Sequence, residues 1–255
     1  MRRHAQPAAG RDRSRRRFAA DASHELRTPL AILRTNLEVV RSDPGATIRD
    51  YRDMSATLDR TLARLERLTS DLLTLSRGEG PIDAAPVPLE HLVQGIISDL
   101  QPLALTSQIL LRQDLVRNVT VGGDEELLRR AVGNVIENGI RYNRPGGEVA
   151  IGMRPEELRA VISVADTGIG IPKESQARVF EPFHRVGQAR DRRRGGAGLG
   201  LAMTNEIVRR HGGTIRLESC PDEGSTFTIA LPLMHDDSPS RASHDGSVRQ
   251  ELRVT

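Results

Sequence analysis

The chain has 255 residues, of which 37% are hydrophobic and 28% are charged, so it can fold but is polar for a single compact domain. Aromatic residues make up 2% and tryptophan is absent, which argues against binding of single-stranded nucleic acid by base stacking. The one cysteine, Cys220, excludes an internal disulfide framework and is typical of a reducing compartment. No run of about 18 apolar residues occurs, so no membrane-spanning helix is expected.

The formal net charge of +3 is unevenly distributed. Residues 1–17 hold seven arginines and one aspartate, a balance of +6, which leaves −3 for the rest. Such a segment could contact nucleic acid or anionic lipid, and it also resembles the cytoplasmic flank of a membrane segment. We interpret it as a solvated end, expect residues 1–13 to be disordered, and expect no nucleic-acid partner.

Two long amphipathic helices are predicted first. The helix over residues 18–41 has a heptad seam made of Leu26, Leu30, Leu33, Leu37 and Val40. A turn over residues 42–45 follows, and residues 47–77 carry a second seam. One hairpin has too little facing surface to bury both seams. We therefore expect residues 14–78 to form a four-helix bundle as a homodimer.

The pattern changes after residue 78. Residues 79–87 contain Gly and Pro without periodicity and are expected to be a linker. Helices are then expected over 89–105, 125–142 and 199–211, and strands over 109–115, 119–121, 149–153, 158–166, 214–218 and 226–231. This alternation predicts an α+β sandwich over residues 88–233. Residues 234–255 are polar and aperiodic, and are expected to be a disordered tail.

The segment DASHELRTPL (residues 21–30) carries the first candidate chemistry. His24 falls on the outer side of the heptad, so its imidazole is expected to be an exposed nucleophile. Glu25 could hold or accept the other ring proton, and Thr28 lies one turn further on the same face. Pro29 cannot donate to the Glu25 carbonyl, which predicts a loosened or kinked helix. We assign no role to the other six histidines.

Four further motifs follow in the second domain. The segment NVIENGIRYN (134–143) places Asn134, Glu137, Asn138 and Arg141 on one helix face, where amide oxygens suit Mg²⁺. DTGIG (166–170) follows a buried strand and offers a carboxylate to an adenine amine, with glycines that permit close approach. FEPFHR (180–185) precedes GAGLG (196–200), a glycine-rich loop before a helix N-terminus that favours phosphate.

These five segments together resemble, in order, the H, N, first glycine, F and second glycine boxes of bacterial sensor histidine kinases. The resemblance covers residues 14–233. A single glycine box would be weak support, whereas five boxes in this order are specific. Gly139 stands where the family usually has Ala, at a cost of about 1 kcal/mol in a helix interior.

The resemblance implies a Bergerat-type domain that binds ATP and Mg²⁺. Asn138 and Asn134 would hold the metal, and the nucleotide would contact Asn134, Asn138, Arg141, Tyr142, Asp166, Gly168, Gly170, Phe183, Gly196, Gly198, Leu199 and Gly200. Residues 172–195 would form a lid, with Phe180 and Phe183 at its base. His24 would be autophosphorylated, with Glu25 as base or orienter, and would pass the phosphoryl group to an Asp of a response regulator. Thr28 would position water for a phosphatase reaction.

Alternatives stay open. A Bergerat-fold ATPase that hydrolyses ATP would need a catalytic Glu four residues before Asn138, where this chain has Asn134. A non-catalytic dimerisation and signalling module is the second alternative, and the intact boxes argue against it.

We expect a cytoplasmic chain. Because 23 residues precede His24, we expect either that a membrane-anchored sensor part is missing or that a partner supplies the signal.

Overall fold

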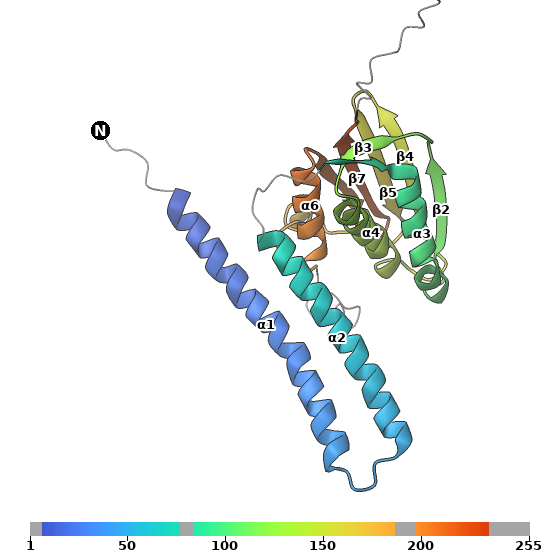
Figure 1. The fold of residues 1–255 in the computed structure, drawn as a ribbon. Coiled ribbons are helices and arrows are strands. Elements are labelled where there is room, and N and C mark those ends of the chain that lie inside the picture. Colours follow the sequence, from blue (N-terminus) through green and yellow to red (C-terminus); the bar gives the residue numbers. More distant parts are fainter. Residues whose placement is uncertain (1–6, 77–83, 187–196, 235–255) are drawn as a thin grey trace, which may run out of the picture.

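A computed structural model describes residues 7–76, 84–186 and 197–234. Two long helices, α1 (Pro7–Ser42) and α2 (Ile48–Ser76), run antiparallel as a hairpin that projects away from the rest of the molecule (Figure 1). The predicted helical hairpin is thereby confirmed. None of the helices within the described residues is both long and apolar enough to cross a lipid bilayer.

Helix α1 is longer than expected at its N-terminal end. It begins at Pro7, so residues 7–13, which we expected to be disordered, are helical. Proline is favoured at the first helical position because its missing N–H needs no partner there. Alanine and arginine, which dominate the following residues, are strong helix formers. The helix also continues through Pro29 as one element.

The turn between the two helices is fixed by side chains that bond to the backbone. The Gly45 N–H donates to Asp43 Oδ1 at 2.8 Å. Thr47 and Asp50 then cap α2, because Asp50 Oδ2 accepts from the Thr47 N–H at 2.8 Å and from its hydroxyl at 2.6 Å. The hydrogen bonds from Thr47 lower the pKa of Asp50 below its ordinary value. The tight turn thus starts α2 in a defined direction.

The heptad seam of α1 is only partly covered within one chain. Leu26, Leu33 and Val40 are half-buried, whereas Leu30 and Leu37 are 54% and 48% exposed. The two sets alternate along the seam, as the first and fourth heptad positions do. One hairpin therefore leaves a second apolar row facing outward.

The second unit is a two-layer α/β sandwich. Its helices are α3 (Leu89–Thr106), α4 (Glu125–Arg141), the single-turn α5 (Lys173–Gln176) and α6 (Gly200–Arg210). Its strands are β1 (Ala85–Pro88), β2 (Leu110–Leu115), β3 (Thr120–Gly123), β4 (Glu148–Glu156), β5 (Arg159–Asp166), β6 (Thr214–Cys220) and β7 (Gly224–Pro232). The predicted α+β class is confirmed.

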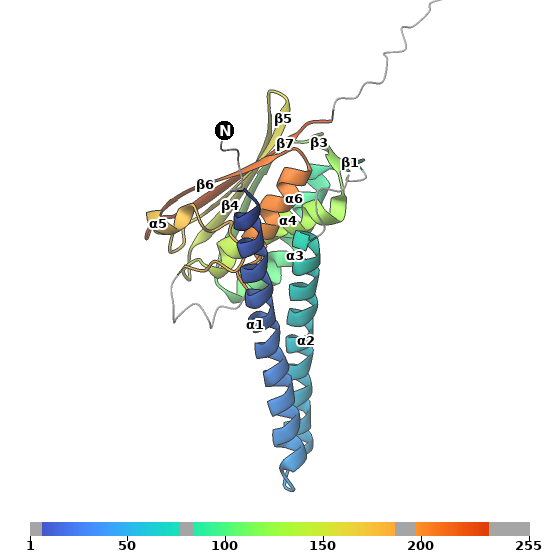
Figure 2. The same cartoon turned by 90° about the vertical axis from the view of Figure 1, so that its left-hand side faces the viewer.

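Five strands form the main sheet in the order β2-β4-β5-β7-β6. Strand β2 pairs parallel to β4, and the other neighbours are antiparallel. Helices α3, α4 and α6 cover one face of this sheet (Figures 1 and 2). Between the layers lies a single large apolar core built from both the helices and the strands, with Ile136, Ile151 and Ile162 among its fully buried members.

The expected linker contains an element that sequence periodicity did not reveal. Strand β1 pairs antiparallel with β3, with Val87 opposite Val121, and both side chains are buried. The strand is short and contains two prolines, which normally indicate a loop. Proline is tolerated here because β1 lies at the edge of a two-stranded sheet. The second domain therefore begins before residue 88.

Candidate functional site

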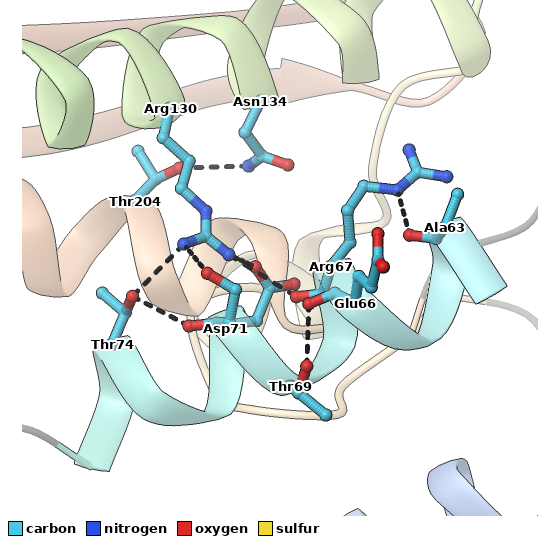
Figure 3. Close-up of polar contacts among 10 residues, drawn as sticks. Ala63, Glu66, Arg67, Thr69, Asp71, Thr74, Arg130, Asn134 and Thr204 are labelled. Atoms are coloured by element: carbon cyan, nitrogen blue, oxygen red, sulfur yellow. Dashed lines mark hydrogen bonds and ion pairs between the residues drawn. The ribbon is translucent and has the colours of Figure 1, made fainter.

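The N-box side chains lie on α4, at the surface that faces α6. The Asp124 side chain caps this helix by accepting from the Leu127 N–H at 3.0 Å. Asn134 Nδ2 donates to Thr204 Oγ1 on α6 at 3.0 Å, which fixes the orientation of the amide (Figure 3). The Arg141 side chain pairs with Glu137 one turn away at 2.6 Å.

Asp166 ends β5 at the base of the same region. Its Oδ1 accepts from the Gly168 N–H at 2.8 Å. Burial raises the pKa of the Asp166 carboxyl above its ordinary value, although backbone N–H groups of Gly168 and Ser225 oppose this shift. A half-buried carboxylate with one oxygen held by the backbone is suited to accept from a neutral amine donor.

A cavity of about 560 Å³ joins these motifs. Its walls come from α2, α3, α4, the segment after β5 and the start of α6. Of the predicted nucleotide-binding residues, the cavity is lined by Asn134, Asn138, Arg141, Tyr142, Asp166, Gly170, Gly198, Leu199 and Gly200. A volume of several hundred Å³ with a few convergent polar groups is typical of a small-molecule site.

Two predicted site residues, Gly168 and Phe183, do not line the cavity. Gly168 packs against the protein itself, since a Cβ there would come within 2.5 Å of the Tyr142 carbonyl oxygen. Phe183 is not among the cavity-lining residues; its ring lies 5.5 Å from that of Phe18 on α1. The prediction for Gly196 lies outside the described residues, as does most of the arginine-rich stretch of the expected lid.

The donor set at α4 fits a magnesium ion. Asn134 and Asn138 are one turn apart on the helix and both line the cavity. Because the Asn134 nitrogen is held by Thr204, its oxygen is directed toward Gly200, where an added Cβ would lie 2.2 Å away. Magnesium takes few protein oxygens and shares its shell with water and phosphates.

The H-box residues lie on α1 beside α2. His24 is exposed, and the Thr28 hydroxyl donates to its carbonyl oxygen at 3.3 Å. The Glu25 carboxylate lies 3.9 Å from the Arg64 guanidinium on α2. Successive helix side chains do not face each other, so Glu25 is better placed toward Arg64 than toward the ring of His24. Its role as base or orienter stays a prediction.

Two family models match the chain. One describes the His Kinase A (phospho-acceptor) domain and matches residues 14–81. The other describes a histidine kinase-, DNA gyrase B- and HSP90-like ATPase and matches residues 123–235. The chain belongs to the histidine kinase family.

Curated relatives of this histidine kinase include the sensor histidine kinase RppB of Synechocystis sp., which is 40% identical over 220 residues, 85% of this chain and 48% of RppB. The sensor-like histidine kinase SenX3 of Mycobacterium tuberculosis is 36% identical over 245 residues, 92% of this chain and 59% of SenX3. The chain therefore spans about half the length of the curated relatives it matches.

Solved structures share the fold. The Acinetobacter baumannii histidine kinase AdeS has a TM-score of 0.66 and 23% identity over 83% of this chain and 98% of that one. Full-length ShkA in complex with AMPPNP has a TM-score of 0.64 and 26% identity, over 84% of this chain and 45% of that one. The predicted arrangement of a helical hairpin followed by a Bergerat-type domain is confirmed.

The sequence did not predict the residues through which the hairpin of this histidine kinase contacts its second domain. Arg64, Arg67, Leu68 and Asp71 of α2 line the cavity together with the N-box residues. Only the spacing of charged residues along α2 could have drawn attention to them, and such a run is usually a solvated helix face. Phe18 lies six residues before His24, and its contact with Phe183 was equally invisible in the sequence.

Proposed function

We propose that this chain is the core of an ATP-dependent protein-histidine kinase. One observation carries the proposal: the cavity that contains the N-box and glycine-box residues is closed on one side by α2. There Arg64 lines the cavity and also pairs with Glu25, the neighbour of His24. Residues 14–78 would dimerise and carry the phosphoryl group, and residues 88–233 would bind the nucleotide.

The proposed reaction is transfer of the γ-phosphoryl group of ATP to the His24 imidazole. The lone pair of one ring nitrogen forms a bond to the γ-phosphorus, and the bond from that phosphorus to the β,γ-bridging oxygen breaks, so ADP leaves. The other ring nitrogen gives up its proton. Glu25 is the proposed base, and its carboxylate would have to turn from Arg64 toward the ring. Magnesium held by Asn134 and Asn138 would offset charge on the phosphates.

Similar proteins support the proposed nucleotide and partners. AMPPNP, an ATP analogue, is bound in the ShkA structure, and the histidine kinase ThkA was solved in complex with the response regulator protein TrrA. We infer that phospho-His24 donates its phosphoryl group to an Asp of a response regulator. We also infer that Thr28 positions water when that phosphoryl group is removed from the regulator. The names of the relatives include the word sensor, which supports control by an input part. We propose that this part is membrane-anchored and that the core described above lies in the cytosol.

The first experiment incubates the purified chain with ATP that is radiolabelled at the γ-phosphate. We expect a label on the protein that acid removes and alkali does not, as phosphohistidine requires. His24→Gln should abolish this label. His91→Gln, an exposed histidine on α3, is the matched control and should keep it.

Two other results would refute the kinase proposal. Release of inorganic phosphate from ATP, with no label on the protein, would favour a Bergerat-fold ATPase. Neither label nor nucleotide binding would favour a non-catalytic dimerisation and signalling module. Asn134 occupies the position where a hydrolytic enzyme of this fold needs a carboxylate base, and we therefore expect transfer rather than hydrolysis.

A further inference from the structure

Arg130 of α4 reaches out of the ATP-binding domain to the hairpin (Figure 3). One terminal nitrogen donates to Ser70 Oγ at 2.7 Å and to Thr74 Oγ1 at 3.3 Å. The other donates to the Arg67 carbonyl oxygen at 3.5 Å and pairs with the Asp71 carboxylate. We call Arg130 and these four α2 partners the Arg130 clamp.

An apolar contact accompanies the clamp. Ala131 of α4 and Met203 and Ile207 of α6 form a small buried cluster, against which Leu75 of α2 packs. Leu68 and Thr74, at 4% and 7% exposed, are the buried residues of α2 among those described. Apolar contact between two surfaces is non-directional, so it does not fix their relative orientation. Hydrogen bonds to a planar guanidinium depend on direction, so they fix how α4 is shifted and rotated relative to α2. The clamp is thus the directional part of the docking surface.

The ion pair between Arg130 and Asp71 is partly buried. The Arg130 and Asp71 side chains are 25% and 19% exposed. Burial raises the pKa of the Asp71 carboxyl, and the positive charge of Arg130 opposes this shift. Partly buried ion pairs of this kind contribute little to overall stability, but leaving one partner without the other is unfavourable. Such a pair selects one docking geometry over others.

The clamp is part of the cavity wall. Arg130, Asp71 and Arg67 all line the cavity, and Asn134 follows Arg130 by one turn of α4. On the hairpin, Arg64 pairs with Glu25 at 3.9 Å, and Phe18 meets Phe183 at 5.5 Å. A rotation of the domain about α2 would therefore change the distance between the cavity and His24.

We propose that the Arg130 clamp positions the ATP-binding domain on α2, so that nucleotide in the cavity faces the H-box of the hairpin. This inference rests on the proposed kinase function. It explains how the two domains are aligned for transfer of the phosphoryl group from ATP to His24. Arg130 and Asp71 are positioning residues that act through the placement of the domain.

The test compares Arg130→Gln, Asp71→Asn and the double variant in full-length chain. We expect kcat for His24 phosphorylation to fall about tenfold or more, because small misplacements of reacting groups have large effects on rate. The KM for ATP should change by a smaller factor than kcat, even though Arg130 and Asp71 line the cavity. The double variant should resemble the single ones, since either change already breaks the pair. Arg130→Lys keeps the positive charge but lacks the planar guanidinium with its several N–H donors. Its rate should therefore lie between those of Arg130→Gln and the wild type.

Matched controls use charges that lie away from the clamp. Arg112→Gln removes an ion pair with Glu148 of 2.8 Å on the β2–β4 side of the same domain. Asp59→Asn changes an exposed carboxylate on α2. Both should leave kcat and KM unchanged. Amide hydrogen exchange can be measured by mass spectrometry. The clamp variants, but not the two controls, should show faster exchange in the C-terminal half of α2 and in α6.

Clamp variants with an unchanged or increased kcat would overturn the proposal, as would a loss of rate explained by a raised KM for ATP. Exchange rates that do not differ from those of the controls would also overturn it. Failure of the kinase proposal looks different: the wild-type chain would carry no label on His24, whatever the exchange data show about docking.

Discussion

Gly170 is required by the protein's own packing, and Gly139 lies in close contact with a neighbouring strand. Gly170 has φ +65°, and a Cβ on it would lie 2.0 Å from the Cys220 carbonyl oxygen. Gly139 lies in an unbroken α4, where a Cβ would come within 3.3 Å of both Val149 methyl groups. The departure from the usual Ala at this position therefore matches a helix that packs closely on β4.

Asp166→Asn tests the role of the buried carboxylate. The amide would present a donor toward the adenine amine, so we expect ATP affinity to fall about tenfold or more. Burial disfavours the charged carboxylate, and removing that charge should leave the melting temperature at pH 7.5 unchanged or higher. Calorimetric titration with ATP and thermal melting measure the two effects. A parallel loss of stability would mean that Asp166 has mainly a structural role.

The same residue predicts a pH dependence of nucleotide binding. The pKa of Asp166 is raised in the folded chain, so its carboxylate is protonated at a higher pH than an exposed aspartate. Binding that needs the carboxylate should therefore be lost as pH falls through this raised pKa, with full affinity above it. Affinity measured from pH 7.5 downward in wild type should show this decline, and Asp166→Asn should not.

At the scale of elements, a histidine joins two helices. His211 follows α6 and is only 9% exposed, so our interpretation that it has no role is wrong. Its Nδ1 lies 2.7 Å from the Ile207 carbonyl oxygen, and its Nε2 accepts from the Asp124 N–H at 3.1 Å. These two bonds are satisfied together only by the neutral ring, with the proton on Nδ1. The residue links the end of α6 to the start of α4.

This arrangement predicts how stability depends on pH. Burial lowers the pKa of His211 in the folded chain. A lowered folded-state pKa means that the stabilisation is complete above the ordinary value of about 6.5 and is lost as pH falls below it. His211→Leu should reduce the free energy of unfolding by about 1–3 kcal/mol at pH 7.5, because the Asp124 N–H loses its acceptor. Denaturant unfolding should show this difference shrinking toward pH 5.5.

At the scale of the whole molecule, the outward row of α1 supports the proposed homodimer. Leu30 and Leu37 are exposed in one chain, and a second hairpin would bury them. Leu37→Glu places a charge in that seam and should raise the dimer dissociation constant about a hundredfold or more. Arg41→Glu, an exposed position off the seam, is the control. Analytical ultracentrifugation measures both, and an unaffected dimer would place the interface elsewhere.

Much of the domain architecture could be predicted because it depends on local periodicity. The heptad leucines indicated the hairpin, and the spacing of Asn134, Glu137 and Asn138 indicated one helix face at the site. Strand β1 could not be predicted, since its prolines are tolerated only through pairing with β3. The extra turns of α1 before residue 14 were missed because a high density of arginine resembles a disordered end.

The order of the five motifs by itself determined the family, since each motif is a short segment whose pattern depends on neighbours in sequence. The same motifs predict His24, Asn138 and Asp166 as site residues. Only the tertiary structure decided that Phe183 meets Phe18, that Glu25 faces Arg64, and that Arg130 bonds to α2. Those contacts join residues far apart in the chain. Their geometry depends on how two separately folded units pack, which no local pattern of residues encodes.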